Sequence, residues 1–276
     1  MDASLPYWIV DAWCAAGPYR TRQPGTPYAF DELLAEHERF DIGRRLCLSA
    51  EARDGVPDEG NAEITRLTAG RDDTGAIWVA LPPARFGGRP AERLLADAQA
   101  AGVAMLAFFP ATHGHHLATW ANGDLYAAME EARLPLAIDV AQAAGGDPGA
   151  ATPQVRYEAI HAVAAAYPKL PIVLWNAWYM DERLQVPILD ACPNVRVGLA
   201  TVFVPTFGIE QYTARYGPDR LIFGSSWPVQ SPGPLLTYVL YADVEDAAKA
   251  AILGGTVREL CAEVRWPVRG MWGEGE

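Results

Sequence analysis

Gly217-Pro-Asp-Arg-Leu-Ile-Phe-Gly-Ser-Ser-Trp-Pro228 is the stretch that best reveals the fold. Its apolar run predicts a strand over Leu221–Trp227, which ends in a turn of small residues and a proline. Other runs along the chain share this apolar, β-rich character, as expected for parallel strands covered on both faces. They are Tyr7–Cys14, Arg44–Ser49, Ala76–Leu81, Ala104–Phe109, Pro135–Val140, Pro171–Asn176 and Val195–Ala200.

Segments with helical periodicity lie between most of these strands. One of them, Ala91–Ala101, ends at Gly102, a residue type that commonly stops helices. The others are Gly123–Ala132, Gln154–Ala166, Arg183–Ala191, Gly208–Tyr216 and a long closing helix over Val244–Glu263. Eight strand–helix units in 276 residues predict an α/β protein with one (β/α)8 TIM barrel domain, residues 1–276. The alternative is a doubly wound open sheet, but no glycine-rich phosphate loop follows an early strand.

The composition narrows the class of function. The net charge is −12, and an acidic surface repels phosphate backbones and anionic lipid. No apolar run reaches the roughly 18 residues of a membrane span, and the first residues lack the basic start of a signal peptide. The four cysteines are far apart and are expected to be reduced thiols. We therefore expect a cytoplasmic protein with a small-molecule partner and no nucleic-acid or membrane partner.

Several segments together resemble the amidohydrolase-2 branch of the amidohydrolase superfamily. The clearest are Cys192-Pro-Asn-Val-Arg-Val197, Gly217–Pro228 and Ala251-Ile-Leu-Gly-Gly-Thr-Val-Arg-Glu-Leu260, and the strands ending at Ala15, Asp139 and Asn176 resemble strands one, five and six of that family. The resemblance implies an amidohydrolase-like barrel with its active site at the carboxyl ends of the strands. It also implies a metal-activated water, as in the hydrolases, lactonases and aromatic decarboxylases of the family.

The chain departs from the family at every expected metal ligand. Trp13 and Ala15 stand where strand one normally carries two histidines, and Asp139 and Asn176 replace the histidines of strands five and six. Ser226 replaces the aspartate of the usual Gly-Ser-Asp-Trp-Pro ending. A divalent ion needs imidazole, thiolate or carboxylate donors, typically three or more from the protein. We therefore expect no metal at this position and no other cofactor.

The candidate catalytic residues lie at two strand ends. Asp139 ends the fifth strand among apolar neighbours, which would raise its pKa and suit a general acid or base. It is equally well explained as a structural carboxyl bonded to Asn176. His113, His115 and His116 follow the fourth strand in one loop, where dense histidines suggest proton transfer, substrate binding or metal binding, the alternative being solvated loop residues.

Aromatic and polar groups at the strand ends are the candidate ligand contacts. Indoles around a concave site favour a flat aromatic ligand, although most aromatic side chains simply pack. Strand alternation predicts that Trp175 points away from the barrel interior. Two arginines in loops could clamp a substrate carboxylate or pair with acidic residues. The predicted substrate-binding set is Trp13, Asn176, Trp178, Tyr179, Ser226, Trp227, Arg20 and Arg85.

These observations predict a metal-independent amidohydrolase-like enzyme that acts by acid–base catalysis on a small aromatic or carbonyl compound. Three reactions stay open: hydrolysis, a decarboxylation or other lyase step, and a cyclisation. The cyclisation would be a step of a biosynthetic pathway. The first alternative is a catalytically inactive barrel that binds a ligand or partner. The second is a metalloenzyme whose site has moved to the three-histidine loop. A homodimer is compatible with the fold, although no residue argues for it.

Overall fold

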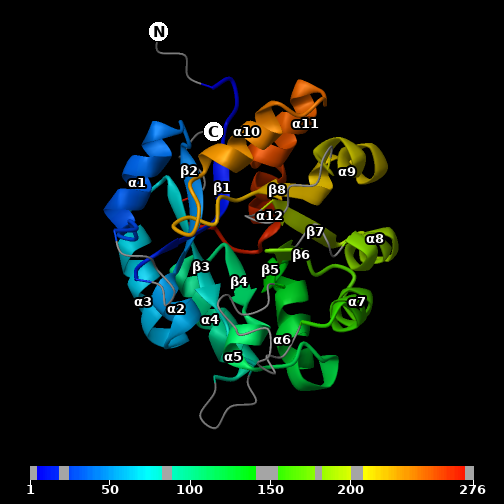
Figure 1. The fold of residues 1–276 in the computed structure, drawn as a ribbon. Coiled ribbons are helices and arrows are strands. Elements are labelled where there is room, and N and C mark those ends of the chain that lie inside the picture. Colours follow the sequence, from blue (N-terminus) through cyan, green and yellow to red (C-terminus); the bar gives the residue numbers. More distant parts are fainter. Residues whose placement is uncertain are drawn as a thin grey trace.

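The computed structural model describes residues 5–18, 25–82, 89–140, 155–177, 182–199 and 208–270. Its centre is an eight-stranded parallel sheet in the order β1 to β8, which confirms the predicted TIM barrel. Figure 1 shows the strands in the middle of the molecule, with the helices surrounding them. The strands are β1 Val10–Ala16, β2 Arg44–Ser49, β3 Thr74–Val79, β4 Met105–Phe108, β5 Leu136–Asp139, β6 Ile172–Trp175, β7 Val195–Leu199 and β8 Leu221–Phe223.

The barrel closes between β1 and the residues that follow β8. The Ala15 N–H donates to the Trp227 carbonyl, and the Ser226 N–H donates to the Trp13 carbonyl, each at 2.8 Å. Strand β8 is shorter than the predicted Leu221–Trp227, because the residues after Phe223 form a turn that bonds to β1 instead of continuing the strand. On its other edge β1 pairs with β2, and the register shifts between Asp11 and Cys14.

Helices occupy all six predicted intervals, two of them (Ala91–Ala101 and Gly208–Tyr216) with the predicted ends, and further helices over residues 30–39, 50–54, 57–68, 110–113 and 233–240 were not predicted. The described residues form twelve α-helices in all. They are α1 Phe30–Arg39, α2 Ala50–Asp54, α3 Pro57–Thr68, α4 Ala91–Ala101, α5 Pro110–His113, α6 Thr119–Ala132, α7 Tyr157–Ala166, α8 Glu182–Ala191, α9 Gly208–Tyr216, α10 Gly233–Leu240, α11 Asp246–Ala250 and α12 Thr256–Glu263. Gly102 ends α4 as predicted, with a left-handed φ of 66°. The predicted long closing helix is interrupted by a π-helical turn, η3 Ala251–Gly255, between α11 and α12.

The segment before β8 is fixed by one buried arginine. Gly217 has a φ of 89°, a conformation that glycine adopts without strain, and it leads into the 3-10 turn η2 Pro218–Arg220. Arg220 then donates to the carbonyls of Leu189, Cys192 and Val195 over 2.7–3.1 Å. These bonds tie the end of α8 and the start of β7 to the strand that ends at the candidate site.

The carboxy-terminal segment covers the opposite end of the barrel. Trp266 Nε1–H donates to the Val103 carbonyl at 2.9 Å, and the Arg265 N–H donates to the Ala132 carbonyl at 3.0 Å. Both acceptors lie just before strands begin. A surface hollow of about 530 Å³ lies beside this segment and is lined partly by Arg258. The hollow is therefore remote from the strand carboxyl ends, where barrels carry their chemistry.

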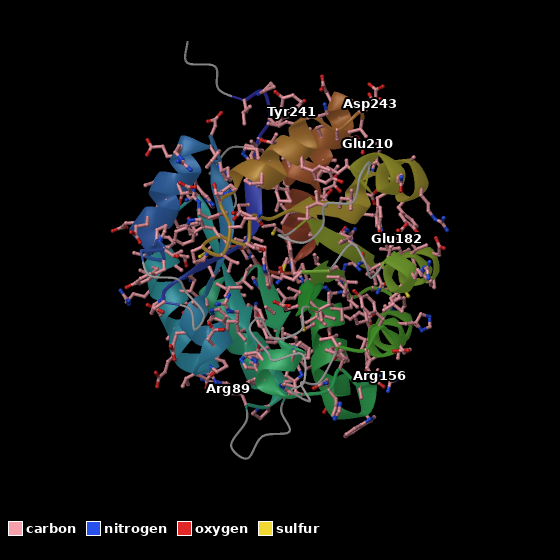
Figure 2. The ribbon with its side chains drawn as sticks, viewed as in Figure 1. Arg89, Arg156, Glu182, Glu210, Tyr241 and Asp243 are labelled. Carbon is pink, nitrogen blue, oxygen red and sulfur yellow. The ribbon has the colours of Figure 1, made fainter. Side chains whose placement is uncertain are left out.

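Charged side chains lie around the outside of the barrel. Figure 2 shows Arg89, Arg156 and Glu182 at the periphery of the ribbon. Glu210 of α9 accepts from the Asp243 N–H at 2.8 Å, which connects α9 to the segment between α10 and α11. No helix among the described residues is both long and apolar enough to cross a bilayer.

Candidate active site

Three polar side chains meet at the carboxyl ends of β5, β6 and β8. Asn176 Nδ2 donates to Asp139 Oδ2 at 2.8 Å, and Ser226 Oγ lies 3.5 Å from Asn176 Oδ1, at the outer limit of a hydrogen bond. Asp139 and Asn176 are partly buried, while Ser226 is buried. The structure thus brings together three of the residues that replace the family's metal ligands. The Asn176 amide thus lies between the Asp139 carboxyl group and the Ser226 hydroxyl group.

Two of these residues have left-handed backbones. The φ angles are 56° at Asn176 and 59° at Ser226. Asparagine visits this region routinely, but serine pays a steric cost because its Cβ approaches the following carbonyl. The Ser226 N–H bond to the Trp13 carbonyl helps to hold the turn in place. Such strained positions cluster at functional sites, so they support a functional reading of this turn.

An aromatic column lies directly beside the polar group. The ring of Trp13 from β1 stacks on Trp175 of β6 with centroids 5.0 Å apart and planes inclined by 10°. Its neighbour Phe109, just after β4, has its ring centroid 5.7 Å from that of Trp13. Strands β1, β4 and β6 are not adjacent in the sheet, so these rings meet inside the barrel. The indole of Trp13 is 5% exposed.

The predicted direction of Trp175 was wrong. Its backbone is the register partner of Asp139, and partners on parallel strands point to the same side of the sheet. The left-handed turn at Asn176 breaks the alternation on which the prediction depended. Two glycines make the space, because a Cβ at Gly198 or Gly224 would lie 2.0 or 2.5 Å from the Trp175 ring. The Trp175 Nε1–H is fully buried and has no hydrogen-bond partner among the described residues.

The donor set at the strand ends does not fit the family's metal ion. Among the five substituted positions, only Asp139 carries an ionisable ligand, and its neighbours are an amide and a hydroxyl. The place of the strand-one histidines holds the Trp13 indole, stacked between two other rings. One carboxyl and two neutral oxygens fall short of the three or more imidazole, thiolate or carboxylate donors that such ions take.

The predicted histidine loop begins as the short helix α5, and its histidines contact α2, the core and the edge of the aromatic column. His113 Nε2 is 2.8 Å from the Arg53 carbonyl at the end of α2, and the His113 ring packs edge-on against Phe109. The His115 ring packs edge-on against Phe108, which in turn contacts Tyr126 of α6. The side chain of His116 is exposed. Burial is the main cause that lowers the pKa of His113, and it lowers the pKa of His115 to about 4.

A second polar network lies behind the aromatic column, and only the position of Asp11 on strand one hinted at it in the sequence. The fully buried Asp11 carboxyl accepts from the N–H groups of Trp13 and Ser225 at 3.1 and 2.8 Å, and from the Ser225 hydroxyl. His37 of α1 is likewise fully buried, and its Nε2 lies 3.0 Å from Asp11 Oδ2. Arg45 Nε–H donates to His37 Nδ1 at 3.0 Å, which connects α1 to β2.

This network is not a metal site, although Asp11, Cys14 and His37 bring ligand atoms within 4.8 Å of one another. The Arg45 Nε–H occupies the lone pair of His37 Nδ1, so the ring proton sits on Nε2, the nitrogen that lies 3.0 Å from Asp11 Oδ2. A protonated Nε2 cannot bind a cation. The network instead fixes the backbone of the Ser225–Ser226 turn from behind.

The remaining predicted contacts divide into two groups. Trp227 is 3% exposed and follows the turn, so its ring is a packing residue of the barrel rim in this conformation. Arg20, Arg85, Trp178 and Tyr179 lie outside the described residues.

A family model, rather than the site, identifies the family of the chain. The family model described as amidohydrolase matches residues 8–260, so the chain belongs to the amidohydrolase family. Its fold is similar to that of 5-carboxyvanillate decarboxylase from Sphingomonas paucimobilis, with 14% identity, a TM-score of 0.69 and coverage of 92% of this chain and 98% of that one. No curated protein sequence matches the chain.

Two other solved structures show the same fold. The 2,6-dihydroxybenzoate decarboxylase from Rhizobium is 12% identical, with a TM-score of 0.67 and coverage of 93% of this chain and 99% of that one. An uncharacterised TIM-barrel protein from Bordetella bronchiseptica is 17% identical, with a TM-score of 0.65 and coverage of 86% and 83%. At these identities the likeness establishes the architecture of the chain.

Proposed function

We propose that this amidohydrolase-family barrel is an enzyme that acts on a small aromatic or carbonyl compound by acid–base catalysis at Asp139, without a divalent ion at the strand ends. The observation that carries the proposal is the Asn176–Asp139 hydrogen bond of 2.8 Å at the carboxyl ends of β5 and β6. The amide orients the carboxyl group at the end of the barrel where this fold places its catalytic residues.

The surroundings of Asp139 support an aromatic substrate. The column of Trp13, Trp175 and Phe109 makes the surroundings of the carboxyl group aromatic, and its rings, each at most 5% exposed, stack on one another. Ser226 supplies a hydroxyl for a substrate oxygen. The proposed substrate site also includes the loop residues predicted to contact the ligand, which lie outside the described residues: Arg20, Arg85, Trp178 and Tyr179.

Decarboxylation of an aromatic acid is the first reaction to test. Two neighbours in fold are named as decarboxylases of substituted benzoates. In such a reaction the ring carbon gains a proton while its carboxyl group leaves as carbon dioxide, so a positioned acid is the group the protein must supply. Asp139 in its protonated form can deliver that proton. Hydrolysis of a reactive ester or lactone, or a cyclisation, would use the same carboxyl group as a base.

The test combines a substrate panel with two matched variants. Hydroxylated benzoates and aromatic lactones are incubated with chelator-treated protein, and products are followed by mass spectrometry. Asp139→Asn should lower kcat/KM by about 10²- to 10⁴-fold, the usual worth of a positioned acid or base. Asp124→Asn, an exposed carboxyl on α6, should leave turnover unchanged. His113→Asn, His115→Asn and His116→Asn test the predicted auxiliary proton transfer by the loop histidines.

Two outcomes would reject the proposal. Turnover that survives Asp139→Asn would remove the assigned role of this residue. Turnover that needs a tightly held ion at the strand ends, detected by elemental analysis and abolished by chelators, would remove the metal-independent mechanism.

An inactive ligand-binding barrel is the second candidate function, because the substituted positions carry mainly neutral and aromatic groups. It predicts saturable quenching of tryptophan fluorescence by an aromatic acid that is never converted, and the quenching should persist in the Asp139→Asn variant.

A further inference from the structure

The surface hollow of about 530 Å³ beside the carboxy-terminal segment carries charge of one sign. Arg258 and Arg265 line it, the rest of its lining is apolar, and no acidic side chain lines it among the described residues. The chain as a whole, by contrast, has a net charge of −12. The volume lies in the range of small-molecule sites, and a concave surface with one sign of charge concentrates ions of the opposite sign. The hollow is therefore suited to a small anion.

The contacts of the two arginines are compatible with an incoming anion. Arg265 Nη1 lies 3.8 Å from Glu131 Oε1, and the two side chains are 63% and 78% exposed. An exposed pair at that distance contributes little, so an anion in the hollow can replace the glutamate. Arg258 Cζ lies 5.4 Å from the ring centroid of Trp8, a cation–π contact that restrains the side chain. Arg44 of β2 lies over the same ring at 5.7 Å, which adds a third positive charge on this side of the molecule.

The apolar wall of the hollow is held in place by the barrel. The main-chain N–H groups of Arg265 and Arg269 each donate at 3.0 Å to a carbonyl just before a strand, β5 for the first and β4 for the second. Between them the Trp266 Nε1–H donates to the Val103 carbonyl at 2.9 Å. A wall that is already ordered loses little conformational entropy when a ligand binds. The hollow is therefore preorganised on its apolar side.

We propose that this hollow binds a small organic anion, whose carboxylate or phosphate group lies on Arg258 and Arg265. Guanidinium groups bind such groups through paired, charge-assisted hydrogen bonds. The apolar body of the ligand packs against the wall, which consists of Val264, Trp266, Pro267 and Val268. The hollow lies at the end of the barrel opposite to Asp139, so this ligand site is separate from the candidate active site and does not depend on the proposed function.

The experiment is an NMR titration that follows the indole N–H signals of the isotope-labelled protein, with Trp266→Phe to assign the Trp266 signal. The probes are benzoate, phenyl phosphate and benzamide, which is the neutral isostere of benzoate. We expect benzoate or phenyl phosphate to shift the Trp266 signal with a Kd below about 1 mM, and benzamide to leave it in place. Arg258→Gln and Arg265→Gln should each weaken this binding about tenfold or more, the usual contribution of a charge-assisted hydrogen bond.

Arg156→Gln is the matched control, because the Arg156 side chain is 78% exposed and lies before α7, outside the lining of the hollow. This variant should bind like the wild type. Circular dichroism and thermal unfolding of each variant show that the barrel is intact. The comparison of benzoate with benzamide tests the charge requirement on the wild-type protein, so it holds even where a variant does not fold.

Three results would overturn the proposal: no shift of the Trp266 signal by either anion up to about 10 mM, ten times the expected Kd; equal binding of benzamide and benzoate; or unchanged binding in both folded arginine variants. The Trp13 signal separates this proposal from the proposed function, because Trp13 belongs to the aromatic column beside Asp139. An anion that shifts the Trp13 signal alone would place the ligand at the strand ends, which overturns this inference and leaves the proposed function standing. Loss of the proposed function in the turnover assay would leave the Trp266 result unaffected.

Discussion

Substituting Gly198 by alanine tests whether the Trp175 indole fills the barrel interior. The new Cβ would lie 2.0 Å from Trp175 Cε3 and 2.2 Å from Cζ3, whereas ordinary carbon contacts are about 3.5–4.0 Å. The ring would have to move by about 1.5 Å to restore an ordinary contact. It has little room, because Trp13 stacks on its face and a Cβ at Gly224 would lie 2.5 Å from the same ring.

We therefore expect Gly198→Ala to lower the free energy of unfolding by about 3 kcal/mol, the upper part of the usual range for overpacking. Gly198 does not have a left-handed φ, so alanine fits the backbone and the cost is steric. Trp175→Ala alone should cost about 3–5 kcal/mol, the usual loss for a buried aromatic residue. In that background the second substitution should cost nothing, because the indole it meets is gone.

The assay is urea unfolding of the four proteins in the double-mutant cycle, followed by circular dichroism. The expected coupling between Gly198→Ala and Trp175→Ala is about 3 kcal/mol, well above the error of such cycles. A Gly198→Ala variant within about 0.5 kcal/mol of the wild type, the range of neutral surface changes, would refute the packing argument. The same penalty with and without Trp175 would show that the strain comes from another neighbour.

Three further predictions concern pH, thiol chemistry and backbone strain. Burial alone would raise the pKa of Asp73, but hydrogen bonds from Arg71 and Arg45 lower it below its usual value. The ionised Asp73 therefore stabilises the fold above about pH 4, and this stabilisation is lost as the pH falls through the pKa of the folded state. Asp73→Asn should reduce the loss of unfolding free energy at acid pH, and an unchanged acid dependence would contradict this. Burial raises the pKa of Cys261 to about 12, so iodoacetamide at pH 8 should label this thiol only upon unfolding, and equally fast labelling in native buffer and in urea would disprove it. At Ser226, with φ 59°, Ser226→Gly should preserve or raise stability while Ser226→Val lowers it by about 1–2 kcal/mol; equal urea midpoints would argue against backbone strain.

The positions of the strands and of the polar residues at their ends could be predicted from the sequence, because they depend on the local pattern of apolar and polar residues. Continuous apolar runs locate the strands, and the barrel places Asp139, Asn176 and Ser226 at one end of it. Replacement of the family's ligands is likewise visible in the sequence alone. The 2.8 Å hydrogen bond between Asn176 and Asp139 follows from the pairing of β5 with β6, which are neighbours both in the chain and in the sheet.

The directions of the side chains and their long-range contacts could be read only from the tertiary structure, because they depend on backbone torsions and on residues distant in the chain. The left-handed turn at Asn176 overrides strand alternation and lets Trp175 point inward, into space left by two glycines on other strands. His37 has the periodicity of a packing or surface residue of its helix, yet it contacts Asp11 and Arg45 from two different strands. The sequence thus determined which groups stand at the mouth of the barrel. Closure of the barrel decided the contacts between strands that are not neighbours in the sheet, such as Trp13 on Trp175, because these contacts join segments whose separation along the chain carries no local pattern.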